Sequence, residues 1–431
     1  MWQSMHNRVI KNASWIIFCK IIQSVLNLIV TMFTARYLGP SNYGLISYAS
    51  SVVAFVLPVM QLGVTNVLVK ELINNPENEG KVMGTAMFMC SISSFITILS
   101  VAFFSIVANA SETETILVCI LYSISLFTQA LELIQYWFQA RLLSKYTSIV
   151  SLCSYSIVTI YKVFLLVTGK SVYWFAVSYA MDYFIIAILC IAIYIRIGGK
   201  RLSVSSEIAR SLWNQGKHYI VSSLMITIFT QTDRIMIKMM MSNADAGFYS
   251  AAVACASMTG FVFTAIIDSA RPVIFESQKN NGTFEKNVIR LYSVVIWFSL
   301  IQCLGISIFA ELIIRILFGV QYIPSIICLR IVVWYTTFSY LGTVRNVWIL
   351  AEKKQNYLWI INFSGALANV VFNLLLIPVI GINGAAIASL VTQIFSNVII
   401  GYIIRPISYN NKLMLAGINP KYLYEIIKKK N

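Results

Sequence analysis

Charged residues are scarce in this chain of 431 residues, and acidic residues are the scarcer sign. Asp and Glu number 16, and all charged residues make up 11% of the sequence, whereas hydrophobic residues make up 58% and the mean hydropathy is +0.78. The core of a soluble protein of this length does not need so much apolar surface. The composition therefore excludes an ordinary soluble protein and indicates an integral membrane protein.

The sequence also lacks the motifs of common enzymes and metal proteins. It has two histidines, and its eight cysteines are scattered without a CxxC pair or a Cys/His cluster, so we expect no disulfide and no bound metal. Neither a GxSxG nor a Walker A motif is present. We therefore expect no cofactor and no ATP hydrolysis.

Long apolar runs fill most of the chain instead. About 20 apolar residues form a helix that crosses the hydrocarbon layer of a bilayer, about 30 Å thick. The runs are continuous rather than alternating, which argues against a β-barrel. They predict an all-α integral membrane protein with about twelve transmembrane helices. The predicted spans are 14–36, 43–68, 82–108, 115–137, 147–168, 173–195, 219–241, 247–268, 288–309, 325–350, 356–378 and 381–403.

Lysine and arginine alternate between the ends of these predicted helices. Twelve spans place both termini on one side of the membrane, and 24 of the 32 basic residues fall on that side. Because positively charged loops stay in the cytoplasm, we expect both termini there. The net charge of +16 then reflects membrane topology beside anionic lipid, and we expect no nucleic-acid partner.

Polar residues form stripes at helical spacing inside several predicted spans. A shift of 203 residues takes Thr31, on the stripe of the first helix, to Arg234, on the stripe of the seventh. This repeat predicts two six-helix bundles, at residues 1–210 and 211–431. A stripe facing lipid would cost several kcal/mol, so we expect the stripes to face a cavity or one another. Hydrogen bonds between helices are the alternative role for their hydroxyl groups.

A further stripe lies on the fourth predicted helix and consists of Thr128, Glu132, Gln135 and Gln139. Two short stretches predict sharp turns instead. Gly39–Pro40 follows the first span, and LIPVIGINGAAIAS at 376–389 separates the last two spans. We expect the helix to end at Pro378 and the small residues after it to pack closely.

Four segments, taken together with the spans and the charge alternation, resemble a known family. They are ARYLGPSNYGLISYA (35–49), QYWFQARLLSKYTSI (135–149), TDRIMIKMMMSNADAGFYSAA (232–252) and AEKKQNYLWIINFSGALANVVFNLLLIPVIGINGAAIAS (351–389). The chain resembles the Wzx-type polysaccharide flippases of the MATE-like exporter superfamily. The resemblance implies two six-helix bundles around a central cavity. It also implies transfer of undecaprenyl-diphosphate-linked oligosaccharides, such as O-antigen repeat units, across a bacterial inner membrane.

A flippase of this kind has to accept a diphosphate and a sugar head, so we expect cations and polar groups in the cavity. A polysaccharide polymerase and a chain-length regulator are the expected protein partners, besides membrane lipid. The expected substrate-binding residues are Lys20, Asn27, Thr31, Arg36, Gln135, Thr227, Gln231, Arg234, Arg330 and Arg345, and the candidates for coupling to H⁺ or Na⁺ are Glu132, Asp233 and Asp268.

Two alternatives stay open at this stage. A drug or cation antiporter of the same fold would need an acidic, aromatic cavity, and the surplus of cations within the spans argues against it. A membrane polymerase or ligase of lipid-linked sugars would need a sizeable outer domain, and the predicted outer loops are short. We therefore expect a transporter rather than an enzyme.

Overall fold

Helices are the regular elements of this chain. The computed structural model describes residues 2–278 and 281–428, with side chains described from Cys19 onwards except those of residues 20, 21, 281, 426 and 427. No strand occurs within these residues. Two compact units are present: unit 1 runs to Gln231, and unit 2 begins at Thr232.

Unit 1 contains seven helices, two short 3₁₀ turns and most of an eighth helix. They are α1 (Trp2–Met60), η1 (Val64–Asn66), α2 (Leu68–Asn74), η2 (Pro76–Asn78), α3 (Glu79–Ala108), α4 (Thr113–Glu132), α5 (Gln135–Ala140), α6 (Ser144–Val167), α7 (Val172–Arg196) and α8 (Ser206–Met240). The boundary between the units falls inside α8, whereas the bundles expected from the sequence divide after residue 210. That division, and a central cavity between the halves, stay predictions.

Unit 2 contains the end of α8 and nine further helices, together with four short turns. They are α9 (Asn243–Ser257), α10 (Gly260–Ser277), α11 (Asn281–Ile308), α12 (Ala310–Leu317), η3 (Val320–Tyr322), α13 (Ser325–Ala351), η4 (Gln355–Tyr357), α14 (Leu358–Ile394), the π-helical turn η5 (Phe395–Ile399), α15 (Ile400–Ile403), η6 (Arg405–Ile407), α16 (Ser408–Ala416) and α17 (Pro420–Lys428).

Nine helical segments in the described residues are long and apolar enough to cross a membrane, and the bent pair α9 and α10 forms a tenth. Two of the nine, Ile22–Met60 and Gln355–Ile403, are 39 and 49 residues long. As straight helices they would measure roughly 60 and 75 Å, about twice the thickness of the hydrocarbon layer. Each contains a break and so accounts for two passes, which brings the structure to the twelve predicted spans.

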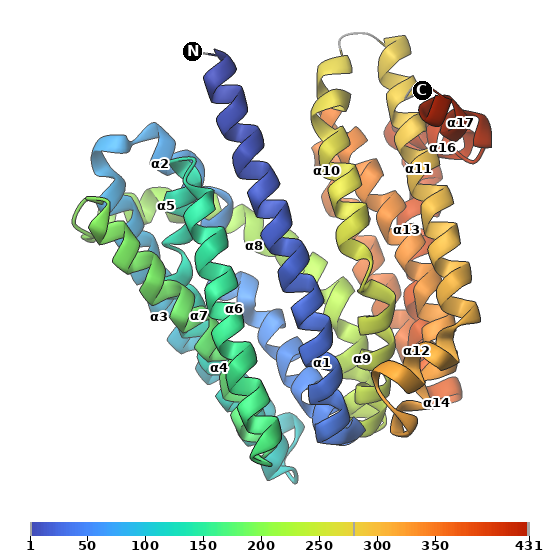
Figure 1. Cartoon of the computed structure of the whole chain (residues 1–431), viewed down its shortest axis with the longest axis horizontal. Helices are drawn as coiled ribbons and strands as arrows, with labels where there is room; N and C mark the ends of the chain where they lie inside the picture. The colour runs from blue at the N-terminus through green and yellow to red at the C-terminus, as the bar shows by residue number, and fades with distance from the viewer. Residues whose placement is uncertain (1, 279–280, 429–431) are drawn as a thin grey trace. The chain divides into compact units, whose positions relative to one another are not determined.

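Glycines at positive φ make both breaks. Gly39 (φ 73°, ψ 172°) interrupts α1, and Figure 1 shows the chain turning back at the lower end of this helix. Ile380 and Gly381 (φ 60°, ψ −140°) interrupt α14 slightly later than expected, because the helix continues past Pro378 to Val379. Side chains with a Cβ rarely adopt such φ values. The two turns predicted from glycine and proline are therefore present in the structure.

Large apolar side chains cover the outward faces of the helices. Leu99 and Phe103 on α3 are 70% and 72% exposed, and Val167 at the end of α6 is 82% exposed. Soluble monomers rarely expose wide apolar surfaces of this kind. Together with the length of the helices, these faces establish an all-α, multi-pass membrane protein, as predicted.

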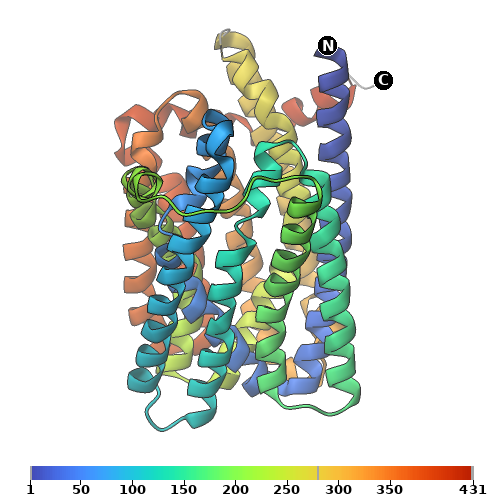
Figure 2. The same ribbon diagram turned by 90° about the vertical axis from the view of Figure 1, so that its left-hand side faces the viewer.

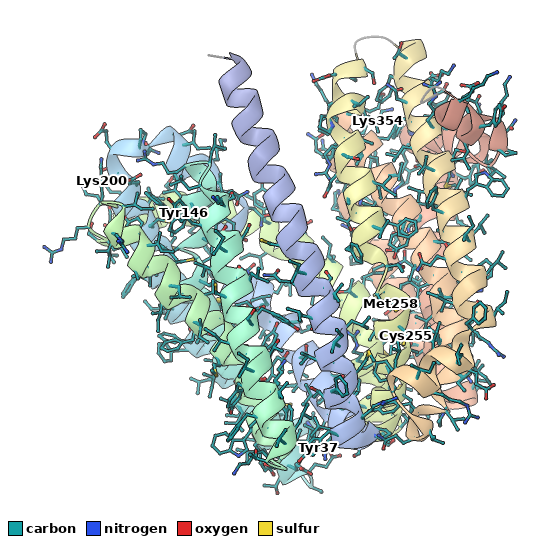
Figure 3. The ribbon with its side chains drawn as sticks, in the orientation of Figure 1. Tyr37, Tyr146, Lys200, Cys255, Met258 and Lys354 are labelled. Carbon is teal, nitrogen blue, oxygen red and sulfur yellow. The ribbon has the colours of Figure 1, made fainter. Side chains whose placement is uncertain are left out.

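An extended segment between α7 and α8 fixes one end of unit 1 (Figure 2). The amide of Ser203 donates to the carbonyl of Gly80 at 3.3 Å. A Cβ on Gly80 would lie 2.5 Å from the carbonyl oxygen of Arg201, so only glycine allows this contact. Figure 3 shows Lys200 and Tyr146 at this end of unit 1 and Tyr37 at the opposite end. The end with Lys200 is the one predicted to face the cytoplasm.

The last helix of unit 2, α17, is held against α11 by ion pairs. The carboxylate of Glu425 lies 3.0 Å from the guanidinium of Arg290 and 3.2 Å from the Lys286 amine. Hydrogen bonds from Arg290 and then Lys286 lower the pKa of Glu425 from its usual value. Figure 1 shows α16 and α17 beside one end of α11.

Candidate functional site

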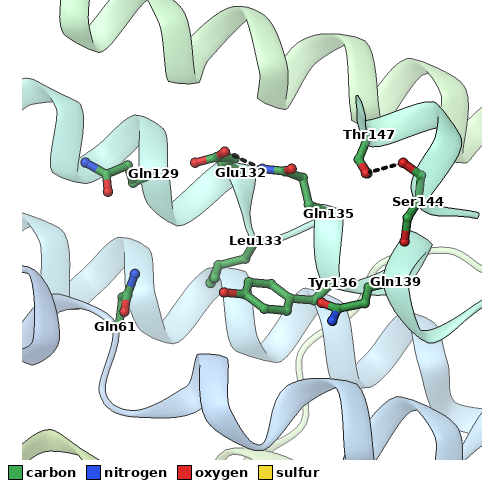
Figure 4. A pocket seen from close by; sticks show the side chains of 9 residues that line it. All are labelled: Gln61, Gln129, Glu132, Leu133, Gln135, Tyr136, Gln139, Ser144 and Thr147. Atoms are coloured by element: carbon green, nitrogen blue, oxygen red, sulfur yellow. Dashed lines mark hydrogen bonds between the residues drawn. The ribbon is translucent and has the colours of Figure 1, made fainter. Parts of the chain in front are cut away.

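Unit 1 contains an open polar cavity of about 310 Å³ beside the break between α4 and α5 (Figure 4). Its lining comes from the residue that follows α1, from α4, α5 and the break between them, and from the first turns of α6. The lining residues are Gln61, Gln129, Glu132, Leu133, Gln135, Tyr136, Gln139, Ser144 and Thr147.

The break in the fourth membrane span forms one wall of this cavity. Leu133 and Ile134 separate α4 from α5, and both side chains are buried. The indole of Trp137 packs edge-on against the ring of Tyr194 at 4.8 Å between centroids. The guanidinium of Arg141 lies 5.7 Å from the same indole. These contacts hold the short helix α5 in place, so that its first turn borders the cavity.

Arg141 also forms an ion pair with Glu79 at the start of α3, through its Nε at 3.1 Å and through Nη2. Glu79 is only 4% exposed. The side chain of Arg141 is 48% exposed, so losing it would leave the buried Glu79 carboxylate without this partner. The pair therefore anchors the end of α5 to α3.

The chemistry of the cavity is dominated by amide groups. Gln135 donates a hydrogen bond to the carboxylate of Glu132, as Figure 4 shows. The Thr147 hydroxyl donates to the Ser144 carbonyl at 2.9 Å. Glutamine side chains both donate and accept hydrogen bonds, as sugar hydroxyl groups do. The half-buried ring of Tyr136 adds an apolar face with a polar tip.

The stripe predicted on the fourth helix largely coincides with this cavity. Glu132, Gln135 and Gln139 line it, although a helix break lies between the first two. Thr128 does not line it, because its hydroxyl is buried and donates to the carbonyl of Ser125 at 3.0 Å. Gln61 was missed by the sequence analysis, since it directly follows α1, far from α4 to α6 in the sequence, and only the tertiary fold brings it here.

Unit 2 contains a second polar cluster, centred on Asp233 of α8. The side chain is 7% exposed and accepts hydrogen bonds from Asn369 at 3.0 Å and Asn373 at 2.7 Å. The hydroxyls of Tyr249 and Ser389 also donate to it. The donors come from α9 and from both arms of α14. A carboxylate accepts about four hydrogen bonds, so the capacity of Asp233 is filled by protein groups.

The polar stripe of α1 lies within unit 1. The amide oxygen of Asn27 accepts a hydrogen bond from Tyr155 of α6 at 3.0 Å and one from Thr31 at 3.4 Å. Arg36 is exposed near the break in α1. Lys20 lies outside the residues whose side chains are described, so its predicted role stays a prediction.

The stripe of α8 is satisfied in part by its own helix. The hydroxyl of Thr227 donates to the carbonyl of Ser223 at 3.0 Å. Gln231 accepts a hydrogen bond from the hydroxyl of Ser51 at 3.1 Å, which ties α8 to α1. The side chain of Arg234 is partly exposed, in contrast to that of its neighbour Asp233. The two adjacent residues thus lie in different surroundings.

The remaining predicted residues of unit 2 lie in three different settings. Arg330 is exposed on α13. Arg345, on the same helix, is 3% exposed, and its guanidinium donates to the carbonyl of Ser396 in the π-helical turn η5. Asp268 is exposed and pairs with Arg271 at 3.0 Å. Within unit 2, therefore, Arg345 stabilises the core, while Arg330 and Asp268 lie on the surface.

Solved structures of membrane transporters share this fold. The lipid II flippase MurJ in an inward closed conformation matches with a TM-score of 0.72 and 14% identity, covering 95% of this chain and 92% of that chain. An inward-facing multidrug resistance MATE family transporter of the MOP superfamily matches with a TM-score of 0.70 and 13% identity, covering 90% and 96%. A MOP superfamily transporter from Pyrococcus furiosus gives 0.62 and 11%, covering 95% and 96%. At these identities the likeness establishes the fold alone.

Comparison of the sequence with protein families identifies the family, which the structural matches do not. No curated protein matches the chain significantly. Residues 9–278, more than half of the chain, match the family described as polysaccharide biosynthesis protein. With its helical membrane fold, its two units and the match over all of α2 to α10, the chain belongs to the polysaccharide biosynthesis protein family.

Proposed function

We propose that this protein moves oligosaccharide repeat units linked to undecaprenyl diphosphate from the cytoplasmic to the outer leaflet of a bacterial inner membrane. O-antigen or a similar surface polysaccharide is the proposed end product. The observation that carries the proposal is the amide-lined cavity of unit 1. Ser144 and Thr147 place it at the same end as Tyr146, the end predicted to face the cytoplasm. A sugar head assembled in the cytoplasm would meet the protein there.

The proposal assigns transport rather than catalysis to the chain. Membership of a polysaccharide biosynthesis family and a fold shared with transporters both support this assignment. A polysaccharide polymerase and a chain-length regulator would use the product on the outer side, and the lipid tail would remain in the bilayer. The diphosphate would be attracted by the predicted cations Lys20, Arg36, Arg234 and Arg330, because the guanidinium groups bind phosphate oxygens in pairs and the lysine ammonium binds them as a point charge.

Among the three acidic candidates for coupling to H⁺ or Na⁺, Glu132 has the most suitable surroundings. Its carboxylate borders a cavity, into which an ion or a proton carrier can move. Asp233 already accepts four hydrogen bonds from protein groups. Asp268 pairs with Arg271 on an exposed face. Glu132 is therefore the proposed coupling residue.

The proposal is tested by deleting the gene and following lipid-linked intermediates. Deletion should trap single, unpolymerised repeat units on the cytoplasmic side, where an enzyme or label added outside cannot reach them. Complementation with the full-length chain should restore export. Accumulation of single units already exposed on the outer leaflet would instead indicate a polymerase or ligase.

The topology requires a separate test. Reporter domains fused at the C-terminus and inserted beside Ser111, in the loop between α3 and α4, should report opposite compartments. The first is expected in the cytoplasm, because 24 of 32 basic residues lie on that side of the predicted topology. The same compartment for both reporters would contradict it.

A further inference from the structure

We infer that the cavity of unit 1 binds one uncharged sugar ring of the repeat unit and discriminates against acidic sugars such as uronic acids. This inference rests on the proposed function and specifies the part of the substrate that the cavity recognises. It follows from three properties of the cavity, which are its charge, its hydrogen-bonding groups and its size.

The charge of the cavity disfavours an anionic sugar. Among the nine described lining residues, Glu132 is the only carboxylate and none is Lys, Arg or His. The basic residues that flank the lining in sequence, Arg141 after α5 and Lys145 beside Ser144, are not among the lining residues, and Arg141 is held by Glu79. A uronic acid would place a second carboxylate beside Glu132 without a counter-charge. Burying an unpaired charge is costly, and like charges in contact add to that cost.

The hydrogen-bonding groups match a neutral sugar. Four glutamine amides line the cavity, and each offers a donor and an acceptor on one side chain. Adjacent hydroxyl groups on a pyranose ring also donate and accept, so one amide can bond to two of them. Glu132 accepts only and would bind hydroxyl or amide hydrogens. These groups recognise hydroxyl-rich or N-acetylated rings without requiring charge.

The size of the cavity limits what it can hold. Its volume of about 310 Å³ lies at the lower end of the range of ligand pockets, roughly 300–1,000 Å³. A single ring with its substituents fits such a volume, whereas a whole repeat unit of several sugars does not. The ring of Tyr136 and the side chain of Leu133 provide an apolar surface for the C–H face of that ring.

The test compares matched probes on the full-length protein in lipid nanodiscs. Methyl glucoside and methyl galactoside are titrated against methyl glucuronide and methyl galacturonide, which differ only in a carboxylate at C6, and binding is followed by ligand-observed NMR. At least one neutral probe should bind more tightly than its acidic counterpart, by about tenfold or more. Equal binding within both pairs, tighter binding of the acids, or no binding of any probe would overturn the inference.

Two variants assign the binding to this cavity. Gln129→Leu should abolish binding of the neutral probe, whereas Gln355→Leu, on an exposed turn of unit 2, should leave it unchanged. Gln139→Lys adds a cation to the cavity and should improve binding of the acidic probe while weakening that of the neutral one. If both cavity variants bind like the wild type, the probes bind elsewhere and the inference is wrong.

The glycoside-binding experiment and the gene-deletion experiment can fail independently of each other. If the neutral probe binds but the deletion strain still exports its glycan normally, the proposed function is wrong, whereas the inferred specificity of the cavity is supported. If the deletion strain traps repeat units but neutral and acidic probes bind equally, the proposed function is supported and the inferred specificity is wrong.

Discussion

The two acidic residues Glu132 and Asp233 looked equivalent in the sequence, and the structure gives them opposite surroundings. Both lie in predicted membrane spans. Glu132 borders an open cavity and accepts a hydrogen bond from Gln135. Asp233 is buried and is surrounded by donors from α9 and α14. A carboxylate whose acceptor sites are filled by the protein stabilises the fold, whereas one beside a cavity can still bind a ligand or an ion.

The largest effect should come from Asp233→Ala. The substitution leaves the buried donors of Asn369, Asn373, Tyr249 and Ser389 without their acceptor. Removing one partner of a buried polar network typically costs about 3–5 kcal/mol of unfolding free energy. Denaturation of the purified protein in detergent measures this loss. The control Glu311→Gln removes an exposed carboxylate of unit 2 that pairs with Arg315, and should change stability by less than about 1 kcal/mol. A similar, small loss for both variants would show that the network does not hold unit 2 together.

A smaller loss is expected for Asn373→Leu, which removes one donor to Asp233. A hydrogen bond to a charged group contributes about 1.5–3 kcal/mol. The same denaturation experiment measures it, with the exposed Asn356→Leu as the matched control. Combining the variant with Asp233→Ala sharpens the test. If the two residues interact, the double variant should lose less stability than the sum of the single losses. Strict additivity would contradict the contact.

Glu132→Gln should separate stability from function. Because the side chain borders a cavity, the loss of unfolding free energy should stay below about 1 kcal/mol. Binding of the neutral methyl glycoside should nevertheless fall by roughly tenfold or more, since the variant loses a charged acceptor. Export in complemented cells should fall as well. Glu114→Gln, exposed near the start of α4, is the control. A large loss of stability for Glu132→Gln would make it a structural residue like Asp233.

The smallest effect should come from Thr147→Val. Its hydroxyl already donates to the Ser144 carbonyl on its own helix, so little hydrogen-bonding capacity faces a ligand. We expect a change of about 0.5 kcal/mol or less in stability and roughly twofold or less in glycoside binding. Glycoside titration with the variant measures it. A tenfold loss of glycoside affinity would indicate that the sugar binds closer to α6 than to Glu132.

Much of the fold could be predicted from the sequence, because its determinants are local. Apolar runs mark the membrane helices, and Gly39 and Gly381 lie at the two breaks where turns were expected. The break between α4 and α5 was not predicted, since neither Leu133 nor Ile134 is a glycine or proline, the residues that indicate a break in a helix. It nevertheless forms one wall of the cavity.

The residues of the candidate site were harder to predict than the fold, because contacts between residues far apart in the sequence determine which side chains come together. The donors from α14 to Asp233 lie 136, 140 and 156 residues further along the chain. Nothing near Asp233 in the sequence indicates them. Arg345 was expected to face the cavity, yet its position deep in the core depends on how α13 packs against the turn η5. Glu132, Gln135 and Gln139 line one cavity although the break between α4 and α5 separates Glu132 from Gln135, so helical spacing accounts for their proximity only in part, and their predicted roles stay predictions.

The breaks in α1 and α14 have a consequence for protease accessibility. Proteases bind their substrates in an extended conformation and therefore need a loop of several residues. At Gly39 and at Ile380–Gly381 the chain reverses within one or two non-helical residues, so these turns offer no such segment. The connection between α3 and α4 has exposed residues at Ala110, Ser111 and Glu112. Protease added to the outer side, where the predicted topology puts all three connections, should cut at residues 110–112 and leave the turns at Gly39 and Gly381 intact.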